Sequence, residues 1–176
     1  MISVDFENVF LAKNGLWLAK EVGLFCPAVN MRKHLVFDQR EWNRYGKGAD
    51  QTCKWANPYQ PWHRVSFKLR DYDTLTKHVR VLLENYNPIL VYDTAIDLKV
   101  LQTLQVDSLQ IIDVSKLVAD RVGQRITLHT ALLAFGVEHD RRSLHNPFAD
   151  SMYTYKLWEK LQPSKSDSSI GFPSRL

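Results

Sequence analysis

The sequence has no long hydrophobic run and very little cysteine, and both absences narrow the class of protein. No stretch approaches the about 18 consecutive apolar residues that a membrane-spanning helix needs. The opening Met1-Ile2-Ser3-Val4-Asp5 lacks the charged, apolar and small-residue order of a signal peptide. Two cysteines, Cys26 and Cys53, are too few for a disulfide scaffold, and neither belongs to a Cys-x-x-Cys pair that would indicate zinc or redox chemistry. We expect an intracellular protein, with the cytoplasm as its compartment and with free thiols.

The composition that is present is that of an ordinary globular domain. The 176 residues are 45% hydrophobic and 24% charged, which is enough apolar chain for one sizeable core. The net charge of +4 favours an anionic partner only modestly, because many proteins without one are equally basic. Residues 162–176 are rich in Ser, Pro and Gly. We expect one domain over residues 1–161 and a flexible tail over residues 162–176.

The first third of the chain carries strand patterns. Over residues 1–7 apolar and polar residues alternate, so that Asp5 and Glu7 share one face of a strand. Two further extended segments, residues 20–25 and 33–37, are separated by a turn and predict an antiparallel meander. An irregular stretch follows, over roughly residues 38–63.

From residue 71 the apolar spacing changes to that of helices. A stripe that starts at Leu75 predicts a helix that ends at Asn87-Pro88. The apolar run at residues 89–92 is typical of a strand covered on both faces, and the next helix is expected to turn Ile96 toward the core.

The alternation continues to residue 161. Residues 110–114 predict another strand. Three helices are expected after it, over residues 115–122, from Thr127 to a cap at Gly136, and from a cap at Asn146 to Leu161. A meander followed by crossover helices predicts an α/β fold with a mixed central sheet flanked by helices.

Acidic side chains at three places are candidates for chemistry. Asp5 and Glu7 share a strand face, although such pairs are also common on solvated surfaces. Asp97 lies at the edge of an apolar stripe, where a buried carboxylate needs a cation or hydrogen-bond donors, unless a small rotation of the helix leaves it at the solvent border. Asp150 stands in a first helical turn, where it could simply favour the helix dipole.

His145 precedes the same helix and adds a group that titrates near neutrality, although it could also be an ordinary surface residue. Together, four hard oxygen ligands and an imidazole are what two-metal phosphodiester hydrolysis needs. Two divalent ions about 4 Å apart hold the phosphate and activate a water, while the imidazole takes its proton.

Three segments resemble the motifs of the DEDDh 3′-to-5′ exonucleases, a family with a ribonuclease-H-like fold. The segments are residues 5–7, residues 91–101 around Asp97, and residues 145–150. Residues 112–117, 128–137 and 150–155 also resemble family segments, so that the resemblance covers about residues 1–161. The final His-x-x-x-x-Asp motif is similar to that of this branch, whose relatives place a Tyr where this chain has Asn146.

The resemblance implies a metal-dependent nuclease. Two Mg²⁺ or Mn²⁺ ions would be held by four carboxylates, those of Asp5, Glu7, Asp97 and Asp150. The general base would be His145. The implied partner is single-stranded RNA or DNA with a free 3′ end, and the segment at residues 112–117 favours RNA weakly.

The chain departs from the family pattern beside these motifs. Asn8 stands where the family usually has Thr, and Tyr92-Asp93 stands where it has His-Asn. Because such neighbours help to contact the substrate terminus, nucleotide preference and 3′-end geometry stay open. The nearby positions at which we expect substrate contacts are Asn8, Phe10, Leu11 and Tyr92.

Residues 38–64 do not match the family. They mix cations with flat rings, a combination suited to phosphates and stacked bases, and we expect contacts from Arg44, Lys54 and Trp55. An equal alternative is that the tryptophans anchor a loop while the cations are solvated. Cys53 and His63 lack a complete set of zinc ligands.

The leading hypothesis is therefore a metal-dependent 3′-to-5′ exonuclease. One alternative is a catalytically silent nucleic-acid-binding domain of the same fold, although a binder would not need all five catalytic residues. The other is an unrelated α/β protein in which the motifs arose by chance.

Overall fold

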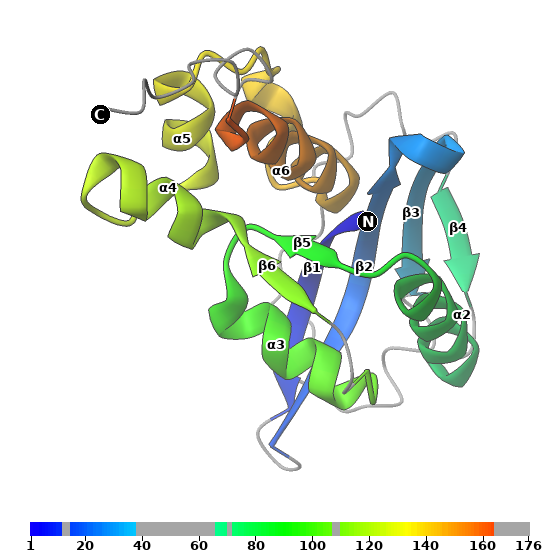
Figure 1. Ribbon diagram of the computed structural model, residues 1–176. Helices are drawn as coiled ribbons and strands as arrows, with labels where there is room; N and C mark the ends of the chain where they lie inside the picture. Colours follow the sequence, from blue (N-terminus) through cyan, green and yellow to red (C-terminus); the bar gives the residue numbers. More distant parts are fainter. Residues whose placement is uncertain (12–14, 38–65, 70–71, 107–109, 164–176) are drawn as a thin grey trace, which may run out of the picture.

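One mixed sheet forms the centre of the protein in the computed structural model, which describes residues 1–11, 15–37, 66–69, 72–106 and 110–163 (Figure 1). Six strands lie in the order β4-β3-β2-β1-β5-β6. The antiparallel part is β1 (Ile2–Leu11), β2 (Leu16–Cys26) and β3 (Met31–Phe37). The parallel additions are β4 (Ser66–Leu69) on β3, β5 (Ile89–Val91) on β1 and β6 (Ile111–Asp113) on β5. The predicted meander and mixed sheet are confirmed.

Helices cover both faces of this sheet (Figure 1). One face carries α2 (Tyr72–Asn85) and α3 (Thr94–Thr103). The other carries α6 (Pro147–Leu161), against which α4 (Val114–Val122) and α5 (Leu128–Ala134) pack. Two 3₁₀ turns complete the described chain, at Pro27–Val29 and Arg141–Ser143. Among the described helices, none is both long and apolar enough to cross a membrane.

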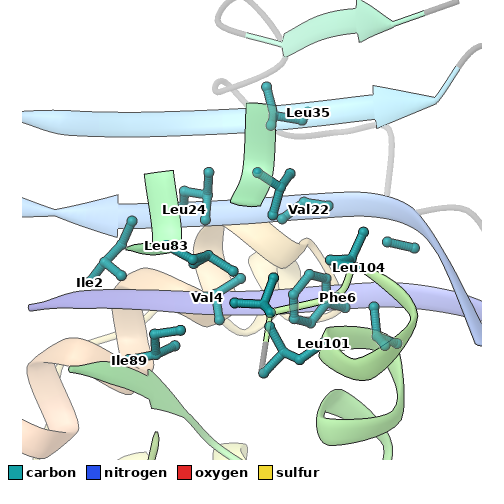
Figure 2. Packing of buried hydrophobic residues seen from close by; sticks show 14 of the residues in the cluster. Ile2, Val4, Phe6, Val22, Leu24, Leu35, Leu83, Ile89, Leu101 and Leu104 are labelled. Carbon is teal, nitrogen blue, oxygen red and sulfur yellow. The ribbon is translucent and has the colours of Figure 1, made fainter. Parts of the chain in front are cut away.

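The alternation along β1 divides its side chains between two cores. Ile2, Val4 and Phe6 are buried in the core beneath α2 and α3, where Figure 2 shows them among Leu83 and Leu101. The opposite face of β1 lies under α6. Because side chains alternate, the Asp5 and Glu7 carboxyl groups belong to this second face, and both are partly buried.

Several details differ from the sequence expectations. β1 and β2 are longer than residues 1–7 and 20–25, because their antiparallel pairing continues to Leu11 and Leu16. β4 has no counterpart among the predicted strands. The core position predicted for Ile96 is wrong: this side chain is 42% exposed, because α3 begins at Thr94 and buries Asp97 instead.

The expected irregular stretch over residues 38–63 lies outside the described residues. So does the predicted tail, apart from Gln162 and Pro163.

Candidate active site

β1 supplies two of the four predicted carboxylates. In the ladder with β2, Asp5 pairs with Gly23 and Glu7 pairs with Glu21. The register shifts directly after Glu7, where β2 carries one extra residue, the fully buried Lys20. Such a bulge changes the local direction of the strand and re-aims its side chains. Asp5 and Glu7 therefore stand just before a break in the regular ladder.

The third carboxylate comes from the helix that follows β5. β5 runs parallel to β1, with Ile89 beside Ile2 and Leu90 beside Ser3, so the carboxyl end of β5 points along β1 toward Asp5. Asp93 then caps α3 by accepting a hydrogen bond from the Ala95 amide over 3.0 Å. This start places Asp97 in the first turn on the buried side, where it is 8% exposed. The prediction that Asp97 faces the protein is confirmed.

The fourth carboxylate lies in the first turn of α6. The Asn146 side chain caps this helix by accepting hydrogen bonds from the amides of Phe148 and Ala149, at 3.1 and 3.2 Å. Pro147 occupies the first helical position, which needs no amide donor. The predicted helix start is confirmed, and Asp150 lies one turn inside it.

A glycine allows this helix start to approach the sheet. A Cβ on Gly23 would lie 1.9 Å from the carbonyl oxygen of Pro147, so a larger residue does not fit without movement of α6. Gly23 is the ladder partner of Asp5. The close contact between β2 and α6 therefore brings the first turn of α6, with Asp150, beside Asp5.

A cavity of about 270 Å³ opens between these elements. Its lining residues are Asp5, Phe6, Asn8, Tyr92, Asp93, Ala95, Ile96, Asp97, Leu128 and Asp150. Three of the four predicted metal ligands thus share one cavity with two predicted substrate contacts, Asn8 and Tyr92.

Burial and mutual repulsion raise the pKa values of the β1 carboxyl groups. The pKa of Asp5 stands well above its ordinary value because of burial and then the charges of Asp150, Asp97 and Glu7. Burial, with the charges of Glu21 and Asp150, raises the pKa of Glu7 to about 7, although Lys20 lowers it. The charge of Asp150 thus raises the pKa of both β1 carboxyl groups.

The two helical carboxyl groups are perturbed in the same direction. Burial, followed by the charges of Asp93, Asp113 and Glu7, raises the pKa of Asp97 to about 8. Burial also raises the pKa of Asp150 to about 7, against the backbone hydrogen bond from His145. All four groups therefore hold their protons more tightly than isolated carboxyl groups do.

Asp150 provides a direct test of whether a cation fits this site. Its Oδ2 atom accepts a hydrogen bond from the His145 amide over 2.9 Å. Its Oδ1 atom is buried and accepts no hydrogen bond from the described residues. A buried carboxylate oxygen without a donor is suited to a hard divalent cation. In donor chemistry and charge the residues fit such an ion, although no three His, Cys, Asp or Glu side chains within the described ranges already converge on one point.

His145 lies at the exposed edge of the site. Its backbone has a positive φ of 65°, and its amide holds Asp150. The imidazole is exposed and does not line the cavity described above. The structure therefore places the backbone of the predicted general base against Asp150, a predicted metal ligand, and leaves its imidazole exposed to solvent.

The remaining predicted positions are not tested. Phe10 and Leu11 belong to β1, but their side chains lie outside the described part of the structure. The same holds for the whole of residues 38–65, which include three predicted nucleic-acid contacts and both zinc candidates, namely Arg44, Lys54, Trp55, Cys53 and His63.

Asp113 is a charged neighbour that the sequence reasoning did not assign. It accepts hydrogen bonds from the Ser115 and Thr94 hydroxyls, at 2.7 and 2.8 Å, and from the Lys116 amide at 3.1 Å. Burial alone would raise the pKa of Asp113, but these hydrogen bonds outweigh it and lower the pKa. Asp113 therefore joins the starts of α3 and α4 and adds a fixed charge near Asp97. Its position as an N-cap before Val-Ser-Lys is the signal that could have identified it.

Comparison with known proteins supports the fold. The structure is similar to the solved Neurospora crassa Pan2 catalytic unit, described as a protease and nuclease domain, with a TM-score of 0.62 and 16% sequence identity. The match covers 96% of this chain but only 28% of that one. No family model and no curated protein sequence matches the chain. The fold is thus α/β and ribonuclease-H-like, with a mixed sheet flanked by helices, as the sequence predicted.

Proposed function

We propose that this chain is a metal-dependent 3′-to-5′ exonuclease that hydrolyses phosphodiester bonds at the 3′ end of single-stranded nucleic acid. The observation that carries the proposal is the meeting of acidic residues from β1, α3 and α6 beside one cavity. The fold shared with a structure that contains a nuclease domain supports it. The weak preference for RNA remains part of the proposal.

The four carboxylates at positions 5, 7, 97 and 150 would hold two Mg²⁺ or Mn²⁺ ions. Bound ions would supply the positive charge that a phosphodiester and its leaving oxygen require during hydrolysis. The buried, unsatisfied Oδ1 of Asp150 supports this assignment, and so do the raised pKa values of Glu7 and Asp97. In the absence of cations, the negative charges of these four carboxylates repel one another.

The other residues at the site would position the substrate and move a proton. His145, exposed beside Asp150, would accept the proton of the attacking water. Tyr92 would offer the terminal base an aromatic surface, and Asn8 would offer an amide to the sugar or phosphate. The Tyr92 hydroxyl donates to the Ile126 carbonyl over 2.7 Å, which fixes the ring.

The decisive assay compares oligonucleotides labelled at the 3′ and at the 5′ end. With Mg²⁺ or Mn²⁺, we expect the 3′ label to be released first as a mononucleotide, while the 5′ label shortens one nucleotide at a time. EDTA should stop both. Asp97→Asn should abolish hydrolysis, whereas Asp120→Asn, a matched change at an exposed position on α4, should not.

The same assay decides against the proposal if the outcome differs. Binding without hydrolysis by the parent protein would favour a silent nucleic-acid-binding domain. Equal hydrolysis by the parent and by Asp97→Asn would remove the carboxylates from the reaction. Parallel RNA and DNA substrates of one sequence measure the preference for RNA.

A further inference from the structure

A second buried polar cluster lies beside the acidic site on the same face of the sheet. Glu21 stands directly across from Glu7, and His34 of β3 pairs with Gly23, the ladder partner of Asp5. Nε2 of His34 donates a hydrogen bond to Oε2 of Glu21 over 2.7 Å. The side chain of His34 is fully buried and that of Glu21 is 4% exposed. The proposed function assigns no role to either residue.

Stability alone does not account for this pair. Two carboxylates directly opposite each other in a ladder repel, and the charge of Glu21 helps to raise the pKa of Glu7. A buried ionisable pair must also give up its hydration, and apolar residues of similar volume are often at least as stable. A role in the neighbouring site explains why the sheet contains these groups.

The position of His34 relative to Glu21 and Glu7 indicates what that role is. β2 lies between β1 and β3, so His34 holds the Glu21 carboxylate on the side away from Glu7. The buried Lys20, at the bulge, lowers the pKa of Glu7 and opposes the effect of Glu21. Glu7 is then left to face the acidic cluster, where the charge of Asp150 also acts on it.

We propose that Glu21 and His34 are positioning residues for Glu7. His34 anchors the Glu21 carboxylate toward β3, which keeps it from competing with Glu7 for the cations at the acidic site. This inference rests on the proposed function, because it concerns how Glu7 would hold a cation.

The test is the binding of Mn²⁺ to the full chain without nucleic acid, followed by electron paramagnetic resonance. His34→Ala removes the anchor and should weaken Mn²⁺ binding about 10- to 100-fold, the usual loss when a partner that orients a metal ligand is removed. His34→Gln keeps an N–H donor and should bind clearly more tightly than His34→Ala. Adding Glu21→Gln to His34→Ala removes the released charge and should restore part of the affinity.

His78→Ala is the control. His78 lies on α2, over the opposite face of the sheet, and its loss should leave Mn²⁺ affinity unchanged. A His34→Ala protein that binds Mn²⁺ as tightly as the parent would overturn the positioning role, even if its melting temperature falls. So would a His34→Gln protein that binds no better than His34→Ala.

A measurement on the parent protein covers the case in which His34→Ala does not fold. Addition of Mg²⁺ should shift the imidazole NMR signals of His34 but not those of His78. Unchanged His34 signals at saturating Mg²⁺ would overturn the proposal. Asp97→Asn distinguishes failure of the proposed function from failure of the positioning role. If the parent binds Mn²⁺ no better than Asp97→Asn, the proposed function fails. If the parent binds Mn²⁺ more tightly than Asp97→Asn, but His34→Ala binds it as tightly as the parent, only the positioning role is refuted.

Discussion

Gly23→Ala should displace Asp150 from the acidic site, although Gly23 itself has no side chain that could take part in catalysis. The added Cβ would lie 1.9 Å from the carbonyl oxygen and 2.0 Å from the carbonyl carbon of Pro147. These are backbone atoms, so no side-chain rotation relieves the overlap. The start of α6 must retreat by about 1.5 Å to reach ordinary contact, and it takes Asp150 with it.

Two magnitudes follow from this displacement. Overpacking of this kind costs about 1–3 kcal/mol of unfolding free energy, which urea denaturation measures. Misplacement of a reacting group by about 1 Å can reduce the rate about 100-fold, so Mn²⁺-dependent hydrolysis should fall by that order.

Leu83→Ala is the control for a general loss of stability. Leu83 is a fully buried residue of α2, on the other face of the sheet, and its truncation should cost about 2–5 kcal/mol without changing Mn²⁺ affinity. If Gly23→Ala retains the stability, the Mn²⁺ affinity and the hydrolysis rate of the parent, the contact between β2 and α6 does not position the site.

Further predictions concern charge at the site. The folded-state pKa values of Asp97, near 8, and of Glu7 and Asp150, near 7, lie above those of free carboxyl groups, so the folded state binds more protons between about pH 4 and 8. The metal-free protein should therefore become more stable as the pH falls from 8 toward 4, and Mg²⁺ should flatten this dependence; a thermal melt series that shows greater stability at pH 8 would contradict the pKa directions. Metal-free Asp97→Asn should melt at or above the temperature of the parent at pH 8, and a clear drop would indicate a structural role. His145→Ala should lose roughly 10²- to 10⁴-fold in single-turnover rate yet still bind Mn²⁺; parent-like turnover by the variant would exclude His145 as the base.

Local sequence patterns predicted the positions of several site residues. The alternation over residues 1–7 put Asp5 and Glu7 on one face, and the structure covers that face with α6. Asn146 and Pro147 predicted the residue at which α6 begins, and therefore that Asp150 lies in its first turn. These features depend on neighbours in the sequence, which is why they could be predicted.

Long-range contacts could not be predicted in this way. The approach of Pro147 to Gly23 depends on the packing of α6 on β2, and nothing near either residue signals it. The Glu21–His34 hydrogen bond depends on the register between β2 and β3. Ile96 was assigned to the wrong face of its helix, because its spacing fitted the apolar stripe while the cavity beside Asp97 leaves that side open.

The most direct test of the central claim is anomalous X-ray diffraction from crystals of the parent protein soaked in Mn²⁺. The proposal predicts manganese bound by the four carboxylates at positions 5, 7, 97 and 150, with an Asp150 oxygen among the ligands, and loss of this signal in Asp97→Asn. Manganese bound only elsewhere, or an unchanged signal in the variant, would contradict the assignment of these carboxylates as a metal site.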